Sequence, residues 1–224
     1  MCSSDLIAPD KQRWMTASYF YPWWRLYATP EAENRAWIAQ QFANGVNTWL
    51  HINGGYSELF DRRSLAPMRD VFARLKRWEP YFDGSRSAAQ VALVYSRYTQ
   101  DNYGGEKTAS RYLDAVRGFY CALLEAHVPF DVVSDKFIDD QLLARYRVLV
   151  LPNLACIDDK DAAAIKRFVK AGGSIVATFD SGLRTRDGTT RKTGAFAEMF
   201  GVEVVGRRTD LKSDRKSTRL NSSH

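Results

Sequence analysis

The second half of the chain alternates short apolar runs with amphipathic segments, and this alternation constrains the fold more than any other feature. The apolar runs occupy residues 91–96, 129–134, 147–153 and 174–179. Helical patterns separate them, and the last of these, over 158–171, closes on Gly172 and Gly173. Strands that are apolar along their whole length are typical of a parallel sheet covered by helices on both faces. The sequence therefore predicts a doubly wound, flavodoxin-like α/β domain.

The first part of the chain carries a shorter α/β pattern. Residues 7–28 read as irregular and aromatic, and Thr29 with Pro30 predicts a helix start. That helix ends at Gly45, a strand follows over 46–52, and residues 83–90 read as a linker. Apolar spacing predicts two buried helix faces: Ala36, Trp37, Phe42 and Ala43 in the first, and Met68, Val71, Phe72, Leu75 and Trp78 in the second. Helix, strand, loop and helix make one and a half α/β units, which we do not expect to fold alone.

Both ends of the chain read as translated sequencing adapter. The segment DRKSTRLNSSH, residues 214–224, matches the codons of a common sequencing-library adapter. The segment MCSSDL, residues 1–6, matches the reverse complement of the beginning of that adapter. We therefore leave both segments out of the fold argument, as one would a tag, and expect that the natural protein extends beyond both ends.

Composition excludes several classes of function. No apolar run approaches the roughly 20 residues that cross a bilayer, so no membrane span is expected. The net charge of +6 is spread among acidic residues, which indicates no nucleic-acid partner. The three cysteines lack paired spacing, so neither a disulfide framework nor a metal site is predicted. Gly104 and Gly105 follow a strand without a dinucleotide or P-loop pattern, so no cofactor is expected.

Cys156 follows a predicted buried strand, where α/β enzymes often keep a nucleophile. Its neighbours are Ala155 and Ile157, whereas a tight nucleophile turn needs small residues on both sides. No histidine follows it that would serve as a base, apart from His224 in the adapter-like tail. We therefore interpret Cys156 as a small packed residue.

Aromatic and polar residues mix in the first part of the chain in the manner of a carbohydrate site. Sugar rings pack their C–H faces on aromatic rings, and their hydroxyls bond to charged and amide groups. The residues with this chemistry near the ends of predicted elements are Trp24, Arg25, Trp49, His51, Asp61 and Arg63. Two alternatives stay open: the tryptophans pack in a core between two domains, and Asp61 pairs with Arg63 or caps the next helix.

The order of these segments resembles the family 42 β-galactosidases and the looser set of hypothetical glycosyl hydrolases around them. ENRAWIAQQFANGV and AAQVALVYS are similar to the end of the (β/α)8 barrel of that family and the start of its next domain. FYCALLEAHVPFDVVSDKFID, YRVLVLPNLACID, FVKAGGSIVATFDSG and FAEMFGV are similar to the β-galactosidase trimerisation domain. That domain is related to class I glutamine amidotransferases without their catalytic residues. The resemblance divides the chain into a barrel end at 7–84 and a trimerisation-like domain at 85–213.

The resemblance also implies an activity. Enzymes of this family are retaining, with catalytic glutamates at the ends of barrel strands four and seven. We match residues 46–52 to strand eight, so both glutamates would precede this chain, and the chain alone would be inactive. The only plausible alternative catalytic carboxylate is Glu58, which follows that strand. A trimer and a carbohydrate substrate are implied for the whole protein.

Three function classes follow. The first is a fragment of a β-galactosidase-like retaining hydrolase of O-glycosidic bonds. The second is a non-catalytic carbohydrate-binding or oligomerisation module. The third is a thiol amidotransferase, which the interpretation of Cys156 disfavours.

A candidate surface for assembly is the segment after the first strand of the second domain. It carries Arg97, Tyr98 and Tyr103, residue types that are enriched in interfaces. It reads either as an interface loop or as a mobile one.

Overall fold

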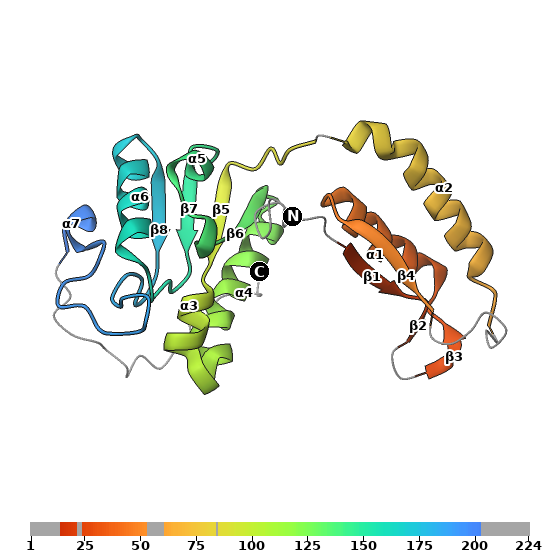
Figure 1. Cartoon of the computed structure of the whole chain (residues 1–224), viewed down its shortest axis with the longest axis horizontal. Coiled ribbons are helices and arrows are strands. Elements are labelled where there is room, and N and C mark those ends of the chain that lie inside the picture. The colour runs from red at the N-terminus through yellow and green to blue at the C-terminus, as the bar shows by residue number, and fades with distance from the viewer. Residues whose placement is uncertain (1–13, 22–23, 53–60, 84, 203–224) are drawn as a thin grey trace, which may run out of the picture.

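The structure is a computed structural model that describes residues 14–21, 24–52, 61–83 and 85–202. These residues form an α/β protein with parallel strand pairing in two sheets (Figure 1). One parallel sheet belongs to the N-terminal part, residues 14–83, and the other to the C-terminal part, residues 85–202. The α/β class and the parallel pairing predicted from the sequence are thereby confirmed.

The sheet of the C-terminal part has four strands in the order β6-β5-β7-β8. Their bounds are β5 Val91–Tyr95, β6 Phe130–Ser134, β7 Val148–Leu151 and β8 Ser174–Ala177. All neighbours are parallel, and Val91 lies opposite both Phe130 and Val148. β6 and β7 both follow β5 in the chain and lie on opposite sides of it, so the direction in which strands are added across the sheet reverses beside β5.

Helical segments connect these strands, and one more follows the last strand. They are α3 Arg97–Thr99, α4 Asp114–Glu125, α5 Asp140–Leu143, α6 Asp159–Lys170 and α7 Ala197–Phe200. In α6 the Asp158 carboxylate accepts the amide of Lys160 at 3.3 Å, and Arg167 and Lys170 lie in the last turn, where cations are favoured. The helix ends before Gly172, whose φ of +99° suits glycine. Among the described helices, none has the length and apolar character that a membrane crossing requires.

The core of the C-terminal part lies on both faces of its sheet. On one face, fully buried Leu149 and Leu151 pack with Ile165 and Phe168 of α6. On the other face, Leu93 and Val150 pack with the side of α4 that carries Phe119 and Leu123. This two-sided burial explains why the strands read as continuous apolar runs.

The N-terminal part is a strand–helix–strand–helix unit with a small hairpin inserted after its first strand. Its elements are β1 Trp14–Ser18, β2 Phe20–Tyr21, β3 Trp24–Ala28, α1 Glu31–Ala43, β4 Asn47–His51 and α2 Leu65–Phe82. β1 pairs with β4 in parallel, with Ser18 opposite His51, and β2 pairs with β3 in antiparallel. Ala17, Ile38, Met68 and Leu75 form its buried apolar cluster.

Four details of the sequence interpretation are wrong. Residues 14–18 form β1 rather than irregular chain, because a parallel partner distant in sequence supplies the hydrogen bonds. The core face of α1 is made by Asn34, Ile38 and Gln41, with Phe42 packed beside them as predicted, while Trp37 is 52% exposed. The segment after β5 is helical from Arg97 onward, through short 3-10 and π turns, rather than an open loop. The Thr29 hydroxyl, moreover, donates to the Ser18 carbonyl at 3.2 Å and does not cap α1.

Candidate functional site

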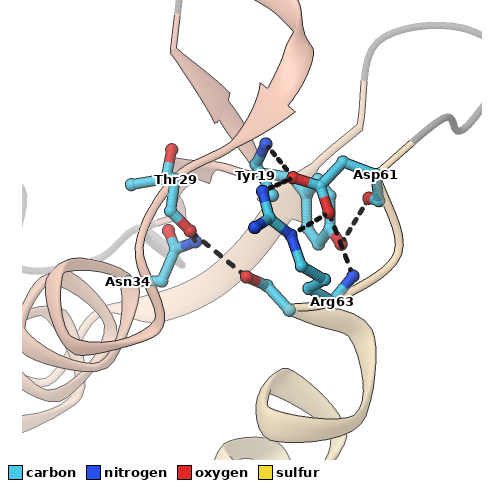
Figure 2. Close-up of polar contacts among 7 residues, drawn as sticks. Tyr19, Thr29, Asn34, Asp61 and Arg63 are labelled. Carbon is cyan, nitrogen blue, oxygen red and sulfur yellow. Dashed lines mark hydrogen bonds and ion pairs between the residues drawn. The ribbon is translucent and has the colours of Figure 1, made fainter.

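Tyr19 joins three segments at the carboxyl ends of β1 and β4 (Figure 2). Its amide N–H donates to the His51 carbonyl at 2.9 Å, and its own carbonyl accepts the amide of Thr29 at 2.7 Å. Its hydroxyl donates to the carbonyl oxygen of Asp61 at 2.9 Å. The side chain is fully buried, and burial raises the pKa of its hydroxyl. Tyr19 therefore fixes the ends of both strands against the segment that leads into α2.

Asp61 and Arg63 form a bidentate ion pair beside Tyr19 (Figure 2). Arg63 donates from Nε to Oδ1 at 2.9 Å and from Nη2 to Oδ2 at 2.8 Å. The Ala28 amide also donates to Oδ2, at 3.0 Å. The Asp61 side chain is 8% exposed and that of Arg63 is 81% exposed. The Arg63 guanidinium, together with the Ala28 amide, holds the pKa of the Asp61 carboxyl well below its usual range.

The sequence left open whether Asp61 pairs with Arg63 or caps the next helix, and the structure answers this question. They pair with each other, and the cap residue of α2 is Ser64, without a side-chain cap. Because the Asp61 carboxylate is engaged by Ala28 and Arg63, its visible role is to tie β3 to the start of α2. The Arg63 guanidinium faces solvent, where it can meet a ligand.

Buried polar residues that the sequence interpretation missed complete this cluster. The Thr29 carbonyl accepts from Asn34 Nδ2 at 3.4 Å and from the Ser64 hydroxyl at 3.3 Å. Thr29, Asn34 and Ser64 are all buried. The one signal in the sequence is Asn34, which occupies a core position of α1. A buried amide needs a hydrogen-bond partner inside the chain.

Trp49 and His51 lie on the face of β4 that is turned away from the helices. Leu50, between them, packs on the cluster of Ala17, Ile38 and Met68, and neighbouring residues of a strand point to opposite faces. Trp49 is 53% exposed, and His51 is half-buried. Thr16 lies opposite Trp49 across the strand pair, and Ser18 lies opposite His51. An exposed indole beside hydroxyl and imidazole groups has the chemistry of a sugar-contacting surface.

The remaining candidates from the first part of the chain are only partly placed. Trp24 and Arg25 lie in β3, and the positions of their side chains fall outside what the structure describes. Glu58 lies outside the described residues altogether. The structure thus brings His51, Asp61 and Arg63 to one region through Tyr19, with Trp49 on the adjoining strand face.

Cys156 is 1% exposed at the carboxyl edge of the larger sheet. Its amide donates to Thr99 Oγ1 at 3.0 Å, and it packs with Tyr103 and Ala155. Burial raises the pKa of the thiol to about 11. Of the two histidines that the structure describes, His51 is in the N-terminal part and His127 precedes β6, at the opposite edge of the sheet. The site holds a packed thiol without a base, in keeping with the interpretation from the sequence.

We expect Cys156 to resist alkylation in the folded chain. At pH 8, a pKa of about 11 leaves about one thiolate in a thousand, and the thiol is also shielded from solvent. Iodoacetamide should therefore label exposed Cys121 at least about a hundredfold faster than Cys156, measured by peptide mass spectrometry. In urea the two cysteines should react at equal rates, and that measurement is the reference. Equal rates in the folded chain would contradict the burial of Cys156.

The residues proposed as an interface loop are engaged inside the chain. Tyr103 is 8% exposed, and its hydroxyl donates to Asp180 Oδ2 at 3.0 Å. Tyr98 bonds to Arg186, whose guanidinium lies 4.0 Å from the centre of its ring. Arg97 pairs with Asp101 at 2.8 Å. The contacts of Tyr98 and Tyr103 hold the segment after β5 against the segment after β8, so it is an ordered part of the domain rather than an open, mobile loop. Its role as an interface stays a prediction.

Within the residues that the structure describes, no three His, Cys, Asp or Glu side chains are grouped so that they could hold a metal ion.

Comparison with known proteins agrees with this architecture. The family model for the β-galactosidase trimerisation domain matches residues 89–223. The match overlaps the terminal segment that we interpret as adapter, and that interpretation stays a prediction. β-Galactosidase GalA of Bacillus licheniformis is 29% identical over 143 residues, which are 61% of this chain and 21% of that protein. β-Galactosidase BglY of Alicyclobacillus acidocaldarius is 32% identical over 122 residues, 51% of this chain and 17% of that protein.

Solved structures give the same fold. The β-galactosidase of Bacillus circulans sp. alkalophilus has a TM-score of 0.65 at 22% identity, covering 82% of this chain and 30% of its own. The α-L-fucosidase isoenzyme 2 of Paenibacillus thiaminolyticus has a TM-score of 0.55 at 22% identity, covering 75% of this chain and 25% of its own. At these identities the likeness concerns the fold alone.

The chain spans about a fifth of the length of the curated relatives that it matches. The family model, in contrast, covers more than half of the chain. On that match, the chain belongs to the family of β-galactosidase trimerisation domains of the family 42 glycoside hydrolases.

Proposed function

We propose that this chain is part of a retaining glycoside hydrolase that acts on β-linked sugars, and that the chain itself is not the catalytic part. The observation that carries the proposal is the family match over the C-terminal part, preceded by a parallel strand–helix–strand unit. A barrel end at residues 7–84 and a flavodoxin-like domain at 85–213 account for both parts. The strand order β6-β5-β7-β8 supports the second of these, since it is the flavodoxin order for the first four strands.

The face of β1 and β4 that carries Trp49 and His51 is the proposed sugar side of the barrel end. Barrel interiors receive alternate side chains of each strand, and active sites lie at the carboxyl ends of the strands. Trp49 would stack on a sugar ring, and the His51 imidazole and the Arg63 guanidinium would bond to hydroxyls. Trp24 and Arg25, in β3, belong to the same proposed surface.

The presence of β1 bears on the missing catalytic groups. If β4 is barrel strand eight, its parallel neighbour β1 takes the place of strand seven. The resemblance implies a glutamate at the end of that strand. Residues 14–21 contain no acidic side chain, and Ser18 and Tyr19 stand where β1 ends. This supports inactivity of the chain.

The same observation favours a second candidate function. A protein whose strand seven ends in Ser18 and Tyr19 lacks one of the two carboxylates that the retaining mechanism uses. In that case the whole protein is a non-catalytic carbohydrate-binding or oligomerisation module.

Covalent trapping separates the two candidates. The uninterrupted gene would be expressed and incubated with a 2-deoxy-2-fluoro-galactoside carrying a good leaving group, which stalls retaining enzymes at the glycosyl-enzyme. The hydrolase proposal expects one labelled carboxylate on a peptide upstream of residue 14, and this result would also mean that β1 is not barrel strand seven. Absence of label together with absence of nitrophenyl β-galactoside hydrolysis would leave the non-catalytic module. A label on Glu58 would mean that the carboxylate in the loop after β4 is the nucleophile.

Assembly is the proposed role of the C-terminal part. The description of the matched family names trimerisation, and a domain with a buried, protonated Cys156 has no evident chemistry of its own. Closed cyclic assemblies are a common solution for soluble proteins. We therefore propose a homo-oligomer, with a trimer as the expected form.

A further inference from the structure

We propose that Arg86 is the hinge between the N-terminal and the C-terminal part of the chain, and that the buried carboxylate of Asp131 is the lock that confines motion to it. One stretch of chain, from the end of α2 to the start of β5, links the two parts (Figure 1). The inference concerns how the two parts move relative to each other, and it does not depend on the proposed function.

The lock consists of two hydroxyls that bond to the Asp131 carboxylate. Asp131 lies in β6 opposite Ala92 and is 1% exposed, a rare position for a charged side chain. The Ser87 hydroxyl donates to Oδ1 at 2.8 Å, and the Tyr146 hydroxyl donates to Oδ2 at 3.0 Å. Burial and the negative charge of Asp131 raise the pKa of the Tyr146 hydroxyl, so it stays a donor. Both oxygens of the buried carboxylate therefore have a partner, as burial demands, and one of the two partners is a linker residue.

The rest of the second half of the linker is fastened to the C-terminal part as well. The Ala89 amide donates to the Ser87 hydroxyl oxygen at 3.2 Å, and Ala89 is buried. The Gln90 carbonyl accepts the amides of Arg147 at 2.8 Å and of Val148 at 3.1 Å, at the start of β7. From Ser87 onward, the chain therefore belongs to the C-terminal part.

The chain before Arg86 is fastened to the N-terminal part. The Asp83 amide donates to the Glu79 carbonyl at 2.9 Å, and the Ser85 amide donates to the Phe82 carbonyl at 3.0 Å, so both residues are bonded to the end of α2. Arg86 itself is exposed and forms no hydrogen bond or ion pair with another residue that the structure describes. In the described chain, Arg86 alone therefore separates the residues bonded to one part from those bonded to the other. Its two backbone dihedrals are free to absorb a rotation.

The two parts leave room for such a rotation. Each apolar cluster of the described residues is confined to one part, and none contains side chains of both. Beside the linker, a cavity of about 490 Å³ lies between the end of α1 and the end of α4. Its lining comprises residues 43–45, 85–89, 123–124 and 127–131. Relative motion of two domains is expected where no large apolar interface joins them.

Limited proteolysis with trypsin tests the lock, because trypsin cleaves after arginine and Arg86 directly precedes Ser87. Cleavage of a held segment follows the population in which that segment opens. We expect Ser87→Ala to raise the rate of cleavage after Arg86 at least about tenfold, relative to linker peptides with the same substitution. Ser87→Thr keeps the hydroxyl and should leave the rate within about twofold of the parent rate. Ser85→Ala, the same change on the other side of Arg86, is the matched control and should also leave the rate unchanged.

Cleavage after Arg167, within α6, is the internal reference for unfolding of the C-terminal part. We expect its rate to be the same in the parent chain and in Ser87→Ala, since Tyr146 still bonds to Asp131 in the variant. A rise at both sites would mean that the substitution unfolds the domain, which would overturn the lock. An unchanged rate after Arg86 would overturn it as well.

Distances between two spin labels test the hinge. A chain with Cys2→Ser and Asp70→Cys would carry one label on α2 and one on exposed Cys121 of α4, since the Cys156 thiol is buried. Pulsed electron spin resonance then gives the distribution of distances between the N-terminal and the C-terminal part.

The width of this distribution distinguishes the outcomes. Arg86→Gly frees the backbone at the hinge and should widen it at least about twofold. Ser87→Ala should widen it similarly, because the hinge then extends towards Gln90, and Ser87→Thr should not. A width indifferent to Arg86→Gly would overturn Arg86 as the hinge. A width indifferent to Ser87→Ala would overturn the lock.

Discussion

Asp61→Ala is expected to destabilise the N-terminal part by about 2 kcal/mol, the largest effect that we expect at the candidate site. The substitution removes the acceptor of the buried Ala28 amide and leaves the Arg63 guanidinium without its bidentate partner. Urea unfolding followed by tryptophan fluorescence measures the change, since Trp14, Trp37 and Trp49 report on this part. Asp70→Ala, at an exposed carboxylate of α2, is the matched control and should change stability by less than about 0.5 kcal/mol.

The contribution of Asp61 also has a defined pH dependence. Its pKa is lowered in the folded chain, so the stability that it contributes is present above its unfolded pKa of about 4 and is lost as pH falls below that value. The stability difference between the parent chain and Asp61→Asn should therefore be constant from pH 5 to 7 and shrink below about pH 4. A difference that grew on acidification would contradict the ion-pair account.

Tyr103→Asp is expected to unfold the C-terminal part, with a loss of about 4 kcal/mol. The new carboxylate would lie in a buried site next to Asp180, and the aromatic contacts with Ala155 and Cys156 would be lost. Tyr103→Phe keeps the ring and removes only the hydroxyl, so it should cost about 1 kcal/mol. Thermal unfolding monitored by circular dichroism distinguishes the two. If Tyr103→Asp melted like the parent chain, the side chain would be at the surface, as an interface loop requires.

This prediction shows where sequence reasoning about the second domain fell short. Arg97, Tyr98 and Tyr103 have the composition of an interface, and the other evidence for their place was the length of the segment and its position after the first strand. Their actual partners, Asp101, Arg186 and Asp180, include two that lie far along the chain. Periodicity reports which face of an element is apolar, and it carries no information about contacts between two loops.

The strands and the main helices of the C-terminal part were predictable because the central strands β5 and β7 are buried on both faces of the sheet. Burial on both faces makes these strands apolar along their length, and the run from Val148 to Leu151 shows it most clearly. The absence of a histidine base near Cys156 was likewise visible in the sequence, and the burial that raises the thiol pKa agrees with it.

The N-terminal part was less predictable, because its elements meet few partners within the described chain. α1 places Asn34, Ile38 and Gln41 inwards and leaves Trp37 exposed, although tryptophan is more apolar than asparagine or glutamine. The strand β1 has only five residues, and it becomes a strand through pairing with β4. Neither outcome follows from local propensity.

The sequence by itself determined the α/β class, the parallel sheet of the C-terminal part and the family, since these depend on apolar periodicity and on motifs that are local in the chain. Only the tertiary structure decided that Tyr19 joins β1, β4 and Asp61 and that Tyr103 faces inwards. Each of these depends on hydrogen bonds or packing between residues more than 30 positions apart. Such contacts are set by how whole elements dock, and a pattern within one element does not contain that information.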